Sequence, residues 1–125
     1  MKSIDNELKD LQETLKLKYK IKDIRLFYYT VNDEKSLTIR NIIMINLLMI
    51  KKRHRNTGIG SSVMNEICNF ADENKCFLTL RTSTKFGSSI KRLVSFYDKF
   101  DFIEKDTNII KDSIFKGRLF IRHYK

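Results

Sequence analysis

The chain has 125 residues, with 25 Lys and Arg against 15 Asp and Glu, which gives a formal net charge of +10. Its 42% of apolar and 32% of charged residues exclude a disordered or low-complexity polymer. The longest apolar run, 42–50, is interrupted by Asn46 and has about half the length that a bilayer requires, and the first ten residues lack the apolar stretch of a signal peptide. Cys68 and Cys76 fit no metal or redox spacing, so we expect ordinary thiols and no metal site. These observations predict one soluble, cytoplasmic domain over 1–125 with an anionic ligand or partner and no membrane partner.

The first part of the sequence predicts a helix followed by an antiparallel hairpin. Apolar residues recur at helical spacing over 3–19, and Ser3 is suited to cap the start of that helix. Residues 24–31 are rich in β-branched and aromatic side chains, a polar turn signal covers 32–35, and a second extended segment covers 36–50. Because the far half of this second strand is apolar on both sides, we expect it to be central and covered on both faces.

The second part predicts a parallel crossover and one or two terminal strands. Helical periodicity resumes over 61–74, and 77–82 has the pattern of a short strand. Strand, helix and strand in this order form a right-handed crossover with parallel strands. A further helix is expected up to Phe100, and strands are expected over 102–106 and 115–124. The buried face of the first of these helices should comprise Val63, Met64, Ile67, Cys68 and Ala71. The sequence has no repeat or linker, which favours a single domain. An antiparallel hairpin followed by a parallel crossover predicts the α/β fold class, with one mixed sheet.

A turn with two glycines lies between the most apolar strand and the next helix, and it reads Arg55-Asn56-Thr57-Gly58-Ile59-Gly60-Ser61. Glycines let the backbone approach a ligand, and the first amides of a helix lack internal partners, so the turn suits an anion such as a pyrophosphate. A tight turn with a solvated basic flank explains the same residues. A P-loop is excluded because the sequence has no Gly-Lys-Ser/Thr string, and a dinucleotide fingerprint is excluded because Val63 stands where its third glycine belongs.

The arrangement Arg55-x-x-Gly58-x-Gly60 resembles the acetyl-CoA-binding motif Arg/Gln-x-x-Gly-x-Gly/Ala of the Gcn5-related N-acetyltransferase (GNAT) family. The segment 93–102, LVSFYDKFDF, is similar to the second signature of that family, a helical Tyr followed by a Gly-Phe pair. Both motifs occur in the right order around the expected strand, and the resemblance covers 42–104. It implies the GNAT acyl-CoA N-acyltransferase-like fold, trimmed at the N-terminus, because one or more of the first strands of the family are not found before the opening helix.

Four residues depart from the pattern of the family. Lys52 replaces a proline before the first motif, and Asn56 replaces a small residue after the arginine. Ile90 replaces an Asn before the helical Tyr, and Asp101 replaces the glycine of the second signature. The turn at Asp101 must therefore accommodate a side chain.

The resemblance implies that the chain binds acetyl-CoA as a co-substrate. Backbone groups of Leu48, Met49 and Ile50 would line the pantetheine arm, and the amide of Met49 or Ile50 would hold the thioester oxygen. The pyrophosphate would be held by the amides of Asn56, Thr57, Gly58, Ile59, Gly60 and Ser61, with Arg55 supporting the turn or its charge. The run 51–53 would either face the ribose phosphate or form a solvated rim.

The implied activity is transfer of the acetyl group to an amine, which attacks the thioester directly through a tetrahedral intermediate. Tyr97 matches the helical Tyr that acts as general acid toward sulfur in the family, although a core tyrosine explains the same position. No general base is identified, because Thr79 and Met44 stand where other members carry carboxylates. A proton relay through water and an ordinary surface position both remain open for Glu104, Asp106, His54 and His123.

Basic residues outside the glycine turn point to an alternative function. One group lies near the first expected strand, and a second lies at the end of the chain, interleaved with Phe120 and Tyr124. They comprise Lys16, Lys18, Lys20, Lys22 and Arg25, and Lys116, Arg118, Arg122 and Lys125. Such stripes bind nucleic acid in some proteins and are solvated faces in most. The alternatives are a nucleic-acid-binding module on a GNAT-like scaffold, or an enzyme that acetylates a charged aminoacyl-tRNA, as toxin members of the family do. The sequence specifies neither the acceptor, a small molecule or a protein, nor whether the chain forms a homodimer.

Overall fold

The computed structural model describes residues 3–33, 38–49, 58–81, 90–105 and 119–125. Its elements follow the expected order and are α1 (Ile4–Tyr19), β1 (Asp23–Asp33), β2 (Thr38–Met49), α2 (Ile59–Glu73), β3 (Cys76–Arg81), α3 (Ile90–Asp98), β4 (Ile103–Lys105) and β5 (Leu119–Arg122). Helix α2 begins two residues before the expected start, because Gly58 adopts a left-handed conformation that lets the helix begin directly after it. None of the helices in these ranges is long and apolar enough to cross a bilayer.

The five strands form one mixed sheet in the order β1-β2-β3-β5-β4. Strands β1 and β2 pair antiparallel, as the hairpin pattern predicts. Strands β2 and β3 pair parallel with α2 between them in sequence, which confirms the predicted crossover. The sheet and helices together confirm the α/β fold class.

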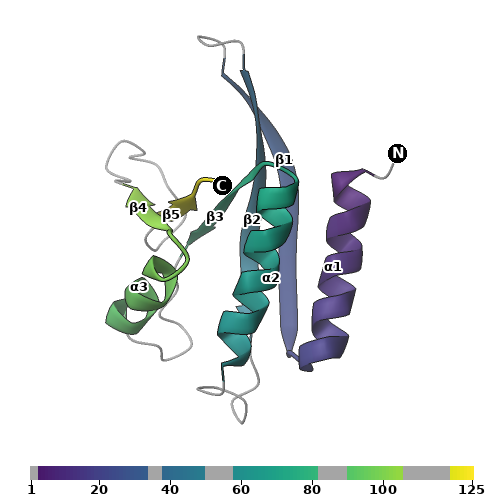
Figure 1. Ribbon diagram of the computed structural model, residues 1–125, viewed down its shortest axis with the longest axis vertical. Coiled ribbons are helices and arrows are strands. Elements are labelled where there is room, and N and C mark those ends of the chain that lie inside the picture. Colours follow the sequence, from purple (N-terminus) through teal and green to yellow (C-terminus); the bar gives the residue numbers. More distant parts are fainter. Residues whose placement is uncertain (1–2, 34–37, 50–57, 82–89, 106–118) are drawn as a thin grey trace.

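The helices cover one face of this sheet. Figure 1 shows α2 in front of β2, with α1 beside it next to β1, and Tyr19 of α1 donates a hydrogen bond to Glu66 of α2. Helix α3 lies over the same face, because Tyr97 contacts Phe120 of β5 and Phe120 pairs with Leu80 among the buried side chains. The predicted inner face of α2 is confirmed, since the buried residues of that helix are Val63, Met64, Ile67, Cys68 and Ala71.

Strand β2 is central, but its burial is uneven. Ile43 and Ile45 point toward the helices and are buried, whereas Ile42 and Met44 are only half-buried and Asn46 is exposed. Cover on both faces, as the apolar run predicts, therefore holds only in part. The reason is that α1, α2 and α3 all pack on the same side of the sheet.

Helix α1 is fixed at its start and in its middle by side-chain hydrogen bonds. Ser3 caps the helix as predicted, because its hydroxyl oxygen accepts a bond from the amide of Asn6 at 3.2 Å. Near the middle, the side-chain amide of Gln12 accepts from the backbone N–H of Leu26 at 3.0 Å and donates to the carbonyl oxygen of Leu26 at 3.4 Å. These bonds hold α1 along the edge strand β1.

Candidate functional site

The pairing between β2 and β3 ends partway along β2. Its last pair joins Ile45 and Leu80. The next residue of β3, Arg81, pairs with β5, while β2 continues to Met49 beside β1. Figure 1 shows β3 running away from β2 toward α3 and β5. Beyond Ile45 the described residues give β2 no neighbouring strand on its β3 side, so the backbone groups on that side are available to a ligand.

A β-bulge lies at the point where the two strands separate. Arg25 pairs with Leu47 and Leu26 pairs with Ile45, so Asn46 is the extra residue on β2. A bulge bends its strand and increases the local twist. The bulge therefore accounts for the departure of β2 from β3 at this position.

Two of the residues predicted to line the pantetheine arm lie on this separated segment. Leu48 pairs with Ile24 and Met49 pairs with Asp23, both on β1. The backbone edge of β2 that lies away from β1 therefore faces the opening. Ile50 lies outside the described residues.

The glycine turn reaches the start of α2. Gly58 is the N-cap residue, with φ 85° and ψ −1°, and no side chain caps this end within the described part of the chain. The first backbone bond of the helix runs from the N–H of Ser62 to the carbonyl oxygen of Gly58 at 3.0 Å. The amides of Ile59, Gly60 and Ser61 consequently have no partner inside the helix, and the helix dipole favours an anion in front of them. Arg55, Asn56 and Thr57 lie outside the described residues.

Tyr97 lies near the C-terminal end of α3 in an aromatic environment. Its ring centroid is 5.6 Å from that of Phe120 and 5.7 Å from that of Phe102. Burial raises the pKa of the Tyr97 hydroxyl above its ordinary value. Since Phe120 pairs with Leu80, the ring is one strand away from the last pair between β2 and β3. The Tyr97 ring thus packs on β5, the neighbour of the strand β3 at which the opening begins.

Phe96 connects the glycine turn with Tyr97. A Cβ atom on Gly60 would lie 3.7 Å from Cζ of Phe96, so the two helices are close at this point. The rings of Phe96 and Tyr97 lie edge to face with centroids 5.5 Å apart. The two motifs that the sequence analysis singled out are therefore neighbours in space, although they are separated by about a third of the chain.

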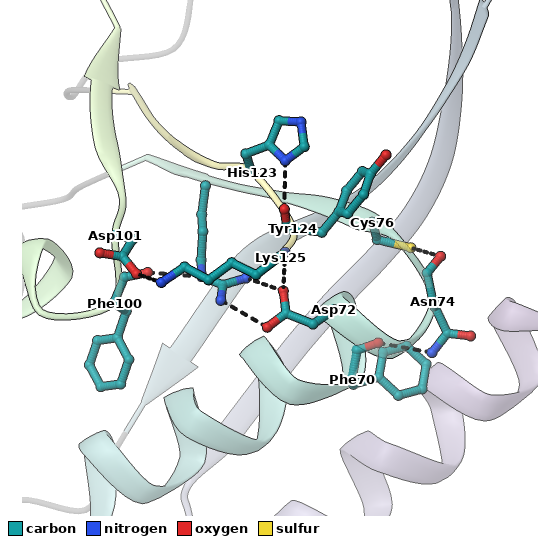
Figure 2. A network of polar contacts seen from close by, with 10 residues as sticks. Phe70, Asp72, Asn74, Cys76, Phe100, Asp101, His123, Tyr124 and Lys125 are labelled. Atoms are coloured by element: carbon teal, nitrogen blue, oxygen red, sulfur yellow. Dashed lines mark hydrogen bonds and ion pairs between the residues drawn. The ribbon is translucent and has the colours of Figure 1, made fainter.

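A cluster of polar side chains lies at the C-terminal end of α2, and the sequence analysis did not predict it. Arg122 was counted there in a basic stripe, but it is only 4% exposed and forms a bidentate pair with Asp72 of α2. Lys125 of the same stripe pairs with Asp101. Figure 2 shows Asp72, Asp101 and Lys125 converging between α2 and the turn after α3. One available signal was the position of Arg122 two residues after Phe120, which places both on the inward face of a strand.

The candidates for a general base stay apart from one another. Thr79 is buried in β3, where it pairs with the half-buried Met44. His123 is exposed, and its ring meets that of Phe77 edge to face, with 4.5 Å between the ring centroids. Glu104 is exposed on β4, and Asp106 and His54 lie outside the described residues. The described residues therefore single out no base.

The environments of both cysteines in this structure favour the unreactive thiol form. Cys68 and Cys76 are both buried and free, and burial raises the pKa of each thiol to about 11. Nucleophilic or metal-binding chemistry needs the thiolate, which is scarce at neutral pH with such a pKa. Within the described ranges no three His, Cys, Asp or Glu side chains gather closely enough to hold a metal ion.

Comparison with known proteins supports the fold through structure alone. No protein-family model and no curated protein sequence matches the chain. Naa50 of Arabidopsis thaliana, solved with the bisubstrate analogue CoA-Ac-MVNAL, is similar with a TM-score of 0.55 and 20% identity over 81% of this chain and 65% of that one. A mutant of the AtaT toxin, bound to the C-terminus of the antitoxin AtaR and acetyl-CoA, has a TM-score of 0.55 and 10% identity over 80% of this chain and 56% of its own.

An acetyltransferase of the GNAT family from Staphylococcus aureus Mu50 has a TM-score of 0.52 and 18% identity over 93% of this chain and 79% of its own. The chain thus spans less than two-thirds of the length of the first two structures. The three likenesses agree on the mixed sheet and its helices. The chain has the fold of the GNAT acetyltransferases.

Proposed function

We propose that the chain is an acetyl-CoA-dependent N-acetyltransferase and a member of the GNAT family. The observation that carries this proposal is the opening between β2 and β3, which begins after Ile45 beside the uncapped start of α2. An extended thiol arm fits along an unpaired strand edge, and a pyrophosphate fits at a free helix start. The similar structures of Naa50 and AtaT contain a CoA analogue and acetyl-CoA, respectively.

In this proposal acetyl-CoA binds through the backbone. The strand edge at Leu48, Met49 and Ile50 binds the pantetheine arm, and an amide of Met49 or Ile50 donates to the thioester oxygen as negative charge develops on it. The pyrophosphate accepts from the amides of the segment 56–61, and Arg55 supports that turn. Apolar side chains are compatible with this role, because the backbone supplies the donors.

Tyr97 acts as the general acid in this mechanism. An amine attacks the thioester carbonyl, a tetrahedral intermediate forms, and the bond between carbon and sulfur breaks. The Tyr97 hydroxyl donates its proton to the departing thiolate. A tyrosine hydroxyl is protonated at neutral pH, and burial raises the pKa of Tyr97 further. The proton of the amine leaves to solvent water. The acceptor is defined here only as an amine.

Thermal denaturation with and without acetyl-CoA tests the cofactor. Ligand at a hundred times its dissociation constant should stabilise the protein by about 2.7 kcal/mol. NAD, which also carries a pyrophosphate, is the control ligand and should give a much smaller shift. The absence of any shift at millimolar acetyl-CoA would contradict the proposal.

The variant Tyr97→Phe tests the chemistry. Loss of the acid should lower kcat at least about tenfold, while the Kd for acetyl-CoA stays within about twofold. Turnover is measured by release of free CoA thiol with a panel of amines, comprising amino acids, polyamines and short peptides with free N-termini. Tyr29→Phe, at a half-exposed tyrosine of the hairpin, is the matched control and should leave kcat unchanged. Equal kcat for Tyr97→Phe and the unmodified protein would remove Tyr97 from the mechanism.

A further inference from the structure

Arg122 uses three N–H groups to join two parts of the molecule. Its Nη1 and Nη2 donate to the two carboxylate oxygens of Asp72 on α2, at 2.8 and 3.1 Å. Its Nε donates to the carbonyl oxygen of Phe100, in the turn after α3, at 2.8 Å. A guanidinium is planar, so these bonds fix both partners in one relative orientation.

The turn that Arg122 holds is the turn that ends the helix of Tyr97. The amides of Phe100 and Phe102 both donate to the carbonyl oxygen of Tyr97, at 3.0 and 3.3 Å. Between them, Asp101 adopts φ 68°, a left-handed conformation that few side chains favour, at the position where the family has glycine. The carbonyl oxygen of Phe100 in this turn accepts from Arg122, which ties the turn to β5.

The last residue reinforces the same junction. The backbone N–H of Lys125 donates to Oδ1 of Asp72 at 3.0 Å, and its ammonium group pairs with Asp101. Figure 2 shows Phe100 and Asp101 on one side of this cluster and Asp72 on the other. Asp72 is therefore the shared anchor for two contacts to the end of α3.

The two ends of helix α2 contribute different groups to the candidate site. Its start presents the free amides next to Gly58, and its end carries Asp72. The rings of Phe96, Phe102 and Phe120 surround Tyr97, but ring contacts allow sliding in a way that a bidentate ion pair does not. Since a buried ion pair is weak evidence for net stability, its geometry is the informative feature here.

We propose that Arg122 is a positioning residue that holds Tyr97 in place relative to the acetyl-CoA site, by fixing the turn after α3 to Asp72 of α2. This inference rests on the proposed function. It assigns Arg122 a role at a distance, since the guanidinium contacts neither the opening between β2 and β3 nor the start of α2.

The informative variant is Arg122→Lys. Lysine keeps the charge that Asp72 requires, so the fold is retained, but one ammonium group cannot bond both carboxylate oxygens and the Phe100 carbonyl in the same geometry. We expect kcat to fall about tenfold, with the Kd for acetyl-CoA within about twofold of the original. Arg40→Lys makes the same change at an exposed arginine of β2, far along the strand from the opening, and is the matched control, with kcat expected within about twofold.

A double-mutant cycle separates positioning from a merely structural effect. In the Tyr97→Phe background, Arg122→Lys should change kcat by less than about twofold, because the group that it positions is already absent. An equal loss of kcat in both backgrounds would overturn the proposal.

Amide hydrogen exchange on the ligand-free protein gives a readout that needs no activity. Arg122→Lys should accelerate exchange at Phe100 and Phe102 about tenfold, with Ile67 in the middle of α2 unchanged. Unchanged exchange at Phe100 and Phe102 would refute the positioning whether or not the chain is an enzyme. Accelerated exchange in a protein that neither binds nor turns over acetyl-CoA would refute the proposed function instead.

Discussion

The two ends of α2 differ in whether their polar groups have partners among the described residues. At the start, Gly58 supplies no side-chain cap, and the first turn contains no acidic residue. At the end, the side chain of Asn74 donates to the carbonyl oxygen of Phe70 at 2.9 Å, and Asp72 binds Arg122 and Lys125. Within the described residues, the polar groups at one end have partners inside the protein, whereas the other end carries no side-chain cap and is where we propose that an anion binds.

We infer from this difference that one end of α2 stabilises the fold and that the other end binds the ligand. Groups that stabilise the fold have their partners inside the molecule, as Asp72 does with Arg122. Groups intended for a ligand must lack such partners, because each internal bond would compete with the ligand. The contrast is open to experiment at both ends of α2 and at the start of α1.

The largest effect is expected at the satisfied end, from Asp72→Asn. The change leaves Arg122 buried without its counter-charge, and breaking a buried pair in this way costs about 3 kcal/mol of unfolding free energy. The free energy of unfolding is measured by urea denaturation at pH 7. Glu73→Gln, at the exposed neighbour, is the matched control and should change it by less than about 0.5 kcal/mol.

The same variant predicts a pH dependence. The hydrogen bond from Arg122 lowers the pKa of the Asp72 carboxyl in the folded state. A lowered folded pKa contributes stability that is present above the unfolded pKa, about 4, and is lost as the pH falls through the folded value. The difference in unfolding free energy between the original protein and Asp72→Asn should therefore shrink below about pH 4. A difference that stays constant down to pH 2 would show that the pair with Arg122 does not depend on the charge of Asp72.

A smaller effect is expected at the open end, from Gly58→Ala compared with Gly60→Ala. Gly58 has φ 85°, where a side chain costs about 1 to 2 kcal/mol, and relief of that strain would turn the amides of the helix start. At Gly60 an added Cβ meets only Phe96, at an ordinary contact distance of 3.7 Å. We expect Gly58→Ala to weaken acetyl-CoA binding about tenfold and Gly60→Ala to change it less than about twofold, as measured by calorimetry.

One outcome of the comparison between the two glycine variants would contradict the proposed binding site. Equal affinities for Gly58→Ala and the original protein would mean that the backbone conformation at the start of α2 plays no part in binding. The anion site would then have to lie elsewhere on the molecule.

The sequence carries most of the fold because its local patterns agree with the tertiary contacts. The spacing from Val63 to Ala71 predicts the buried face of α2 residue by residue, since one helix face packs on the sheet. The polar turn after Val31 likewise predicts the hairpin of β1 and β2.

The features that the sequence does not reveal depend on partners far away in the chain. The bulge at Asn46 is set by the register against β1, and the apolar run 42–50 has no alternation from which that register could be read. The spacing of Arg122 from Phe120 could place it on the inward face of a strand, but its partner Asp72, fifty residues earlier, cannot be read from the sequence. In the candidate site, Gly60 and Tyr97 follow from motifs, whereas their connection through Phe96 follows only from the packing of α2 against α3.

The smallest effect is expected at the start of α1, which differs from the start of α2 in having its own cap. The Ser3 hydroxyl oxygen accepts from the amide of Asn6, and Asp5 and Glu7 place negative charge in the first turn. Ser3→Ala should therefore lower the unfolding free energy by about 1 kcal/mol, whereas Ser3→Asp keeps a capping oxygen and should lower it by less than about 0.3 kcal/mol. Neither variant should alter the affinity for acetyl-CoA, because this helix start already has its partners within the chain. Weaker binding of acetyl-CoA by Ser3→Ala would contradict the distinction between a capped start that stabilises the fold and an uncapped start that binds.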